Sequence, residues 1–175
     1  IFMPAFRQPP PDMLAYGHGY SLNTILLRPK STGSIKIKSP NPSEAPIIDL
    51  NMLDATEDLE ALVGAIKTSR QILSSREFSH LKPKEFRPGP EVQTDEDWKE
   101  YIRANAQTVY HPVGTCKMGV GEDAVVDSNL SVRGLRNLRV IDASIMPRIV
   151  GGNTNAPTIM IAEKGADIIK KTLTH

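Results

Sequence analysis

Apolar side chains recur at helical spacing in a long stretch of the chain that begins at Thr56. They occupy positions i, i+3, i+4 and i+7, which predicts an amphipathic helix with one buried face. The apolar positions are Leu59, Leu62, Val63, Ile66 and Leu73. Acidic residues crowd the start of this stretch and basic residues its end, an order that the helix dipole favours.

A second helix is predicted to begin at Thr94. The Thr94 hydroxyl can cap the helix, and Asp97 stands where a capping box needs its acidic partner. Residues 82–93, between the two helices, are rich in proline and charge and indicate a connector. Three large side chains of the second helix share one face: Trp98, Tyr101 and Ile102.

Shorter apolar runs predict strands. Residues 22–27 are apolar and partly β-branched, and residues 35–38 alternate between apolar and charged side chains. Turn-forming residues separate the two runs, so we expect an antiparallel pair with one face in water. Two further short strands are predicted at residues 124–126 and 138–141.

The end of the chain follows a strand, loop and helix order. Residues 151–155 form a tight polar loop, and Pro157 suits the first turn of a helix that continues to about Lys171. This order is typical of the end of a nucleotide-binding layer.

Length and composition narrow the function classes. The 175 residues suffice for one domain or for pieces of two, and a hydrophobic content of 39% is ordinary for a globular chain. The net charge of +1 provides no field for nucleic acid or for an anionic membrane, so we expect no nucleic-acid partner. We also expect no membrane span, because no apolar run approaches the roughly 20 residues that a span needs.

The start of the chain indicates a fragment. It has no initiator methionine and no signal-peptide architecture, so we expect a beginning that lies elsewhere; a processed mature chain is the alternative. The single cysteine, Cys116, rules out an internal disulfide. The sequence therefore does not identify a compartment, and both a mitochondrial and a secreted location stay open.

Residues 110–119, with the sequence YHPVGTCKMG, are the first of three segments that can carry chemistry. His111 follows the second predicted helix and precedes proline and glycine, so we expect it on a fixed turn. Histidine as a residue type titrates near neutral pH and can accept a proton in catalysis. Taken alone, a structural histidine that only forms hydrogen bonds is the more common case.

The other two segments are residues 139–144 and 151–158. An apolar strand that ends in Asp142 suits a ligand at the carboxyl end of a sheet, whereas the alternative is that Asp142 caps a turn. The glycines of the later segment allow close backbone approach. The helix that follows offers N–H groups and a partial positive charge to a phosphate or an electron-rich ring. A plain loop with a helix cap is the alternative there.

Other types of site find little support. The four histidines have neither regular spacing nor carboxylate companions on one helical face, so no metal site is predicted. The chain lacks the G-x-S-x-G elbow of serine hydrolases and the G-x-G-x-x-G fingerprint of dinucleotide-binding domains. Cys116 lies close to His111 in sequence, but nothing shows that its thiol is activated, and we interpret it as a core residue.

In combination the segments are far more specific. HPVGTCKMG at 111–119, AVVD at 124–127, LRVIDASIMP at 138–147 and GNTNAPTIMIAEK at 152–164 together resemble the C-terminal end of the glucose–methanol–choline (GMC) oxidoreductase family. The choline dehydrogenase and insect-type glucose dehydrogenase branches are the most similar. Upstream, LRPKSTG at 27–33 and IDLNML at 48–53 resemble the substrate domain of that family.

The resemblance implies a fold and a cofactor. Family members bind FAD through an N-terminal Rossmann-type half, which this chain lacks. The chain is therefore expected to be an incomplete, α+β part of such an enzyme. Residues 1–20 enter from the missing half as a loop, and residues 21–118 form the C-terminal portion of an antiparallel-sheet substrate domain with helices. Residues 119–175 return to the FAD domain as its last strand and C-terminal helix.

The resemblance also implies the site residues. The catalytic histidine of the family falls on His111, and its second site residue, a histidine or an asparagine depending on the branch, falls on Asn153. The positions implied for FAD are Asp142 and Ala143 near the phosphate and ribityl region, and Tyr110, Thr154 and Asn155 beside the flavin ring.

The implied reaction is oxidation of the CH–OH group of a choline-, sugar- or other alcohol-type substrate, with hydride transfer to flavin N5. His111 would take or stabilise the hydroxyl proton, and Asn153 would donate a hydrogen bond to the substrate oxygen. Electrons would pass on to a quinone or another acceptor other than NAD. Two alternatives stay open: a catalytically silent family member that acts as a binding module, and a hydrolase that uses His111 with Cys116.

Overall fold

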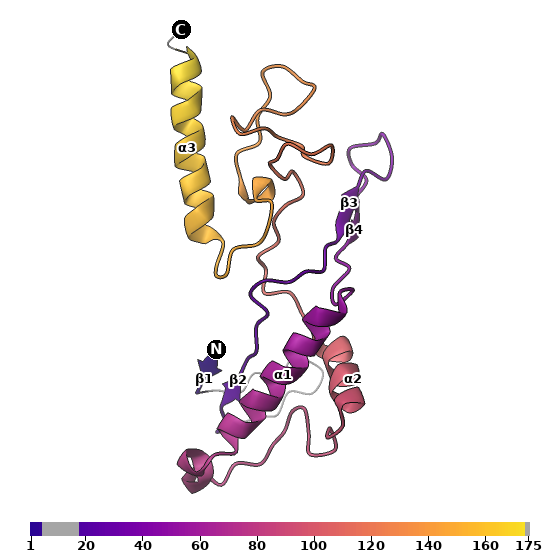
Figure 1. Ribbon diagram of the computed structural model, residues 1–175, viewed down its shortest axis with the longest axis vertical. Coiled ribbons are helices and arrows are strands. Elements are labelled where there is room, and N and C mark those ends of the chain that lie inside the picture. Colours follow the sequence, from indigo (N-terminus) through magenta and orange to yellow (C-terminus); the bar gives the residue numbers. More distant parts are fainter. Residues whose placement is uncertain (5–17, 174–175) are drawn as a thin grey trace. The chain divides into compact units, whose positions relative to one another are not determined.

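The computed structural model describes residues 1–4 and 18–173, and the chain is an α+β structure, as predicted (Figure 1). Its helices are α1 (Thr56–Leu73), α2 (Asp95–Asn105) and α3 (Asn155–Leu173), with short 3-10 helices η1 (Arg76–Leu81) and η2 (Ala143–Ile145). Two small antiparallel sheets complete it: β1 (Phe2–Met3) pairs with β2 (Ser21–Leu22), and β3 (Ser34–Lys36) pairs with β4 (Ile47–Asp49).

The chain divides into two compact units. The first comprises Ile1–Leu26 and Leu53–Ala106, and the second comprises Leu27–Met52 and Gln107–His175. These units differ in their bounds from the predicted domains at 1–20, 21–118 and 119–175. The predicted domains stay a prediction, because compactness alone does not assign a segment to a domain of a larger protein. None of the helices between residues 18 and 173 has the length and hydropathy of a bilayer span.

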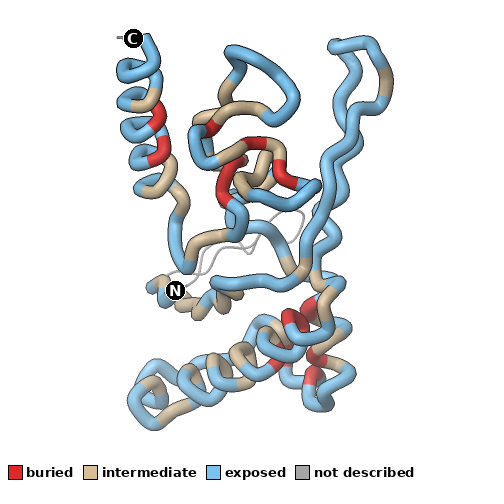
Figure 2. The backbone as a smooth tube through the Cα atoms, turned by 45° about the horizontal axis from the view of Figure 1, so that its top comes forward, coloured by how far each residue is buried: buried red, intermediate tan, exposed pale blue. Residues whose placement is uncertain are grey.

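The first unit is built on the packing of α1 against α2. The predicted apolar faces are confirmed, because Leu59, Val63, Trp98 and Ile102 form one buried cluster with Val92. Figure 2 marks buried residues of both helices in red. Burial of side chains of this size contributes roughly 1.5–3 kcal/mol each, which makes the cluster the main source of stability in this unit.

Arg70 of α1 fixes the connector that leads to α2. Its guanidinium donates hydrogen bonds to the carbonyl oxygens of Val92 (2.6 Å) and Gly89 (2.9 Å) and to the Glu85 carboxylate (2.6 Å). It also lies 4.2 Å from the ring centroid of Trp98, within the range of a cation–π contact. Arg70 therefore anchors the proline-rich connector at three points, and buried Val92 attaches its end to the core.

The start of α2 forms the predicted capping box. The backbone N–H of Asp97 donates to the Thr94 hydroxyl (3.2 Å), and the Asp97 carboxylate accepts from the backbone N–H of Thr94 (2.8 Å). The hydrogen bonds that the carboxylate accepts from the backbone N–H groups of Thr94 and Gln93 hold the pKa of the Asp97 carboxyl below its usual value. The contribution of Asp97 to stability is therefore present at neutral pH and is lost as the pH falls through the lowered folded-state pKa.

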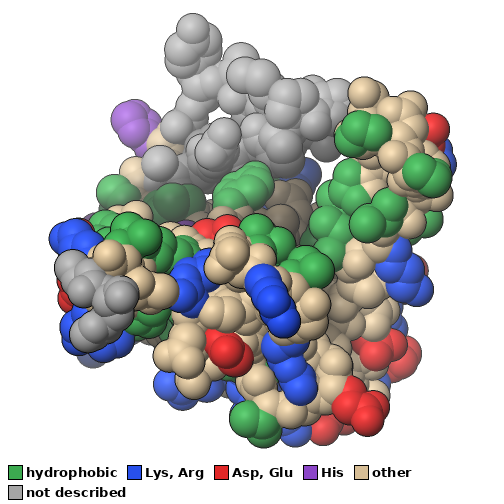
Figure 3. Space-filling view, turned by 90° about the horizontal axis from the view of Figure 1, so that it is seen from above, with side chains coloured by type: hydrophobic (Ala, Val, Ile, Leu, Met, Phe, Trp, Pro, Cys, Tyr) green, Lys and Arg blue, Asp and Glu red, His purple; other side chains and the backbone are tan. Residues whose placement is uncertain are grey.

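The predicted pairing of residues 22–27 with residues 35–38 is wrong. β2 pairs with β1, and β3 pairs with the later strand β4 in the register Ile35 opposite Ile48. The proline-containing loop between β3 and β4 closes a local hairpin, and closing a short loop costs less entropy than a distant pairing. One face of this hairpin is apolar and exposed; its residues are Ile35, Ile37, Ile48 and Leu50. Figure 3 shows exposed hydrophobic side chains among charged ones on one face of the surface.

The predicted strands at 124–126 and 138–141 are also wrong as continuous strands. The structure has isolated bridges there, such as Val126 with Val132 and Ser131 with Arg139. The Asp127 carboxylate accepts hydrogen bonds from the backbone N–H groups of Asn129 (2.8 Å) and Ser131 (3.0 Å). The chain therefore turns directly after Val126. Local side-chain bonds of this kind compete with strand pairing.

The second unit packs around α3, which confirms the predicted third helix. Ile161 of α3 is buried in a cluster with Val126, Leu130, Ile145 and Met146. Gly165 lets the helix approach Ile141 very closely, because a Cβ atom on Gly165 would lie 2.4 Å from Cγ2 of Ile141. The helix axis is therefore fixed against the segment that leads into η2.

Two helical glycines should respond in opposite ways to replacement by alanine. Gly165→Ala should lower the free energy of unfolding by about 1–3 kcal/mol, because the new methyl group overpacks against Ile141. Gly64→Ala should raise it by about 0.4–1 kcal/mol, because no atom lies within 4 Å of the new Cβ and alanine is the better helix former. Urea titration followed by circular dichroism compares the two. Equal effects of both substitutions would contradict the close contact.

Candidate functional site

His111 is held by a hydrogen bond to the start of α3. Its Nδ1 atom lies 2.9 Å from the Thr154 hydroxyl oxygen, a contact between residues 43 positions apart, and both side chains are half-buried. Among residues 1–4 and 18–173 the opposite ring nitrogen, Nε2, has no hydrogen-bond partner. The ring is thus fixed on one side and available on the other.

The residue before His111 has an unusual backbone. Tyr110 has a φ of 64°, in the left-handed region that non-glycine residues seldom occupy, and its N–H donates to the Thr108 hydroxyl (3.1 Å). Its side chain is 83% exposed. The turn at Tyr110 therefore directs the chain into His111 while the phenol ring stays outside the core. Contact of this ring with a flavin is a prediction.

The segment after His111 lies against η2. The N–H of Cys116 donates to the Ser144 carbonyl (3.0 Å), and the N–H of Met118 donates to the Ile145 carbonyl (2.8 Å). Gly114 has a φ of 90°, and a side chain there would also crowd the Met146 carbonyl at 3.3 Å. The glycine is required by both conditions, and it lets the segment approach η2.

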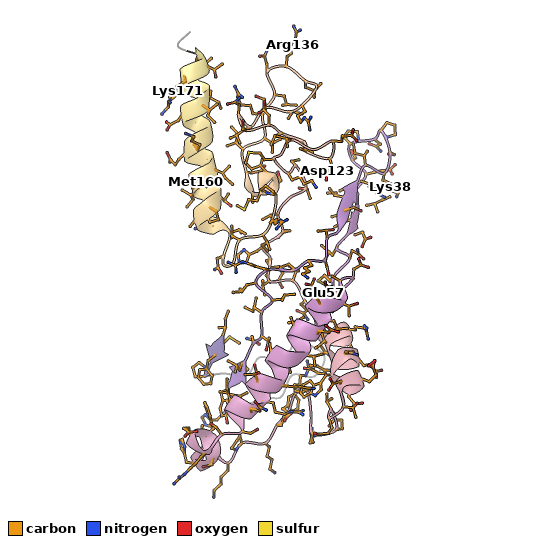
Figure 4. All side chains as sticks on the ribbon, in the orientation of Figure 1. Lys38, Glu57, Asp123, Arg136, Met160 and Lys171 are labelled. Atoms are coloured by element: carbon orange, nitrogen blue, oxygen red, sulfur yellow. The ribbon has the colours of Figure 1, made fainter. Side chains whose placement is uncertain are left out.

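An ion pair closes the loop that follows this segment. Lys117 pairs with Asp123, which is labelled in Figure 4, and the pair lowers the pKa of the Asp123 carboxyl. The N–H of Val125 donates to the carbonyl of Lys117 (2.9 Å). The backbone downstream of His111 is thus held from both ends, by η2 and by this loop.

Asp142 caps η2. Its backbone is extended, and its carboxylate accepts a hydrogen bond from the N–H of Ser144 (2.7 Å). The carboxyl group is exposed, while Ala143 is half-buried and packs against the core of the second unit. The capping alternative for Asp142 is therefore confirmed, and contact of Asp142 and Ala143 with FAD stays a prediction.

The polar loop before α3 presents amide side chains to the outside. Asn153 and Asn155 are exposed on either side of the half-buried Thr154, and Asn155 is the first residue of the helix. The Thr154 carbonyl accepts hydrogen bonds from the N–H (3.0 Å) and the hydroxyl (2.6 Å) of Thr158. Met160, one turn further on and labelled in Figure 4, is 58% exposed.

Two contributors to this region lie in segments quoted from the sequence, residues 151–158 and 27–33, but neither was given a site role there. Thr158 secures Thr154, and its spacing of four residues into a helix is a signal that could have been used. Arg28 lies over Gly151, with a guanidinium nitrogen 3.1 Å from where a Cβ atom of Gly151 would be. Its distance from Gly151 in the sequence left no local signal. Within the described residues no three His, Cys, Asp or Glu side chains gather as metal ligands.

Two substitutions of Asp142 should distinguish the contribution of its capping hydrogen bond to stability from the contribution of its negative charge. Asp142→Ala should lower the free energy of unfolding by about 1 kcal/mol through loss of the cap, whereas Asp142→Asn, which can still accept from Ser144, should lower it by a few tenths at most. Thermal unfolding measures both. If the asparagine variant were as unstable as the alanine variant, the carboxylate charge rather than the cap would be the stabilising element.

The chain matches a known family over most of its length. The family model for the GMC oxidoreductase C-terminal region matches residues 29–162. An alcohol dehydrogenase [acceptor] of Pseudomonas putida is 48% identical over 168 residues, which cover 96% of this chain and 30% of that protein. The mitochondrial choline dehydrogenase of Mus musculus is 45% identical over 153 residues, covering 86% of this chain and 26% of that protein.

The fold agrees with the sequence match. The crystal structure of pyridoxine 4-oxidase from Mesorbium loti is similar over the whole of this chain and 33% of its own, with a TM-score of 0.82 and 35% identity. The chain thus spans about a third of the length of the proteins that it resembles. The resemblance stated from the motifs is confirmed: this chain belongs to the GMC oxidoreductase family.

Proposed function

We propose that this chain forms the C-terminal part of an FAD-dependent oxidoreductase that acts on the CH–OH group of an alcohol, with His111 as the proton acceptor. The observation that carries the proposal is the fixed His111 ring beside the exposed loop that contains Asn153. A half-buried imidazole with one engaged and one available nitrogen has the geometry that a general base needs. Family membership supports the reaction class, and it gives no support to a hydrolase that uses Cys116.

The described residues fit a flavin. The 19-residue helix α3 begins at Asn155, and Asn155 and Ala156 are exposed, so the partial positive charge at this helix start suits an electron-rich ring. Asn153 and Asn155 add exposed amide groups. A similar structure, from Chaetomium thermophilum, is described as an FAD-dependent oxidoreductase. FAD, when bound, supplies the acceptor for the hydride that leaves the carbinol carbon.

Two residues of this chain act on the hydroxyl group of the substrate. Nε2 of His111 takes the O–H proton as the carbon–oxygen double bond forms, so no free alkoxide accumulates. The Asn153 amide donates a hydrogen bond to the same oxygen and stabilises the negative charge that develops on it. Two residues therefore act on one atom, the first by moving a proton and the second by electrostatics.

We assign residues 21–118 to the substrate domain of the enzyme and residues 119–175 to the end of its FAD domain, with residues 1–20 entering from the N-terminal half. The hairpin face is apolar and exposed, and Ile37 on it is 88% exposed. Exposure of this kind supports contact of the hairpin with further protein. The reduced enzyme would pass its electrons to a quinone or another acceptor that is not NAD.

Replacement of His111 should slow the reductive step without removing the cofactor. In the flavin-loaded enzyme that contains this chain, His111→Ala should reduce flavin with alcohol about 10²–10⁴ times more slowly, because general-base assistance is lost. Anaerobic stopped-flow absorbance measures the rate, and the flavin absorbance before mixing reports occupancy. His80→Ala, an exposed histidine in η1, is the matched control and should be unchanged. Wild-type reduction by the His111 variant would refute the assignment.

Replacement of Asn153 should affect the transition state more than ground-state binding. Asn153→Ala should lower kcat/KM by about 10²–10³-fold, because removal of one donor to a developing oxyanion has an effect of that size. Steady-state kinetics with a fixed alcohol separates kcat from KM. Asn129→Ala, in an exposed turn, serves as the control. A rise in KM alone, with kcat intact, would show that Asn153 only binds substrate.

A further inference from the structure

The backbone of Thr154 is held in place at the point where its side chain meets His111. Its own carbonyl accepts two hydrogen bonds from Thr158, at 3.0 and 2.6 Å, which fix the backbone of the turn. The helix that follows is anchored through buried Ile161 and through the contact of Gly165 with Ile141. The hydroxyl group 2.9 Å from Nδ1 of His111 therefore belongs to a turn whose backbone is anchored by these contacts.

A neutral imidazole has two tautomers, and the Thr154 hydroxyl can bond to Nδ1 in either one, as acceptor or as donor. If Nδ1 is protonated, it donates to the Thr154 hydroxyl oxygen and leaves a lone pair on Nε2. If Nε2 is protonated, the hydroxyl donates to Nδ1, and Nε2 has no lone pair with which to accept a proton. Only the first arrangement makes His111 a base at the available nitrogen.

The first arrangement also survives protonation. Once Nε2 accepts a proton, both ring nitrogens carry hydrogen, and Nδ1–H continues to donate to the same Thr154 oxygen. Neither the ring nor the hydroxyl oxygen has to move. A hydrogen bond that strengthens when its donor becomes charged favours the product of the proton transfer.

We propose that Thr154 is a positioning residue: its hydroxyl oxygen accepts the hydrogen bond of Nδ1–H in His111 and so keeps Nε2 as the base. The inference rests on the proposed function of His111, and it gives Thr154 a role different from that of a neighbour of the flavin ring. Thr154 acts through His111 and touches no reacting atom.

The test uses the flavin-loaded enzyme with Thr154→Val, which keeps the shape of the side chain and removes its oxygen. Thr154→Ser keeps the oxygen and should restore the wild-type behaviour, and Thr154→Ala is a second variant without the hydroxyl. The matched control is Thr68→Val, which removes a helical hydroxyl whose one hydrogen bond within the described residues goes to the carbonyl of Gly64 (2.9 Å). Anaerobic flavin reduction should be about tenfold slower in the valine and alanine variants, the size expected for one hydrogen bond. KM should be unchanged.

Nitrogen NMR of ¹⁵N-histidine-labelled enzyme supplies the second readout, with the His111 signals assigned through His111→Gln. We expect Nδ1 protonated and Nε2 unprotonated in the wild-type, Thr154→Ser and Thr68→Val enzymes, and a shift towards the other tautomer in Thr154→Val and Thr154→Ala. Wild-type rate and tautomer in Thr154→Val would overturn the proposal, as would equal losses in the serine and valine variants. Loss of FAD with an unchanged tautomer would also overturn it. If His111→Ala itself reduced flavin at the wild-type rate, the proposed function would fail, and the tautomer measurement alone would then report whether Thr154 sets the protonation of the ring.

Discussion

The hydrogen bond between His111 and Thr154 is the contact on which the account of this chain depends, because it joins two segments that are 43 positions apart and unrelated in secondary structure. One partner follows a left-handed turn at Tyr110, and the other begins a 19-residue helix. A bond of this kind orients a catalytic ring only if both partners are held independently. The structure meets this condition on each side.

On the histidine side, backbone hydrogen bonds tie residues 116 and 118 to η2, and Gly114 permits the approach. On the threonine side, the packing of Gly165 against Ile141 and the burial of Ile161 anchor the helix. Ile141 is followed directly by Asp142, which caps η2. The two supports therefore converge on one short stretch of chain. A change there would displace both partners, even though none of its side chains bonds to His111.

Local signals in the sequence were enough to find the helices. The capping box at Thr94 and Asp97 and the apolar spacing after Thr56 depend only on residues a few positions apart, and both are confirmed. The pairing of β3 with β4 depends on which apolar run lies nearest after a loop, and the prediction chose the wrong partner. The contact of His111 with Thr154 is not local, so no periodicity reveals it. The motifs identified both residues, but only the structure shows that they meet and that Arg28 lies over the loop beside them.

The stabilising features of this chain differ in how closely they relate to the proposed site. Asp142 has a structural role as the cap of η2, and its contact with a cofactor stays a prediction. The capping box and the Trp98 cluster stabilise a unit that holds none of the predicted site residues. All of the predicted site residues lie in the second unit, and the proposed chemistry depends there on the available nitrogen of the His111 imidazole.

The most direct test of that claim is chemical rescue. In the flavin-loaded enzyme with His111→Ala, free imidazole can enter the space left by the side chain and take the hydroxyl proton in its place. The account predicts that the anaerobic rate of flavin reduction by alcohol rises with imidazole concentration, and that it follows the neutral form of imidazole as the pH is varied. A slow variant whose rate does not respond to imidazole at any pH would contradict the role of His111 as the proton acceptor.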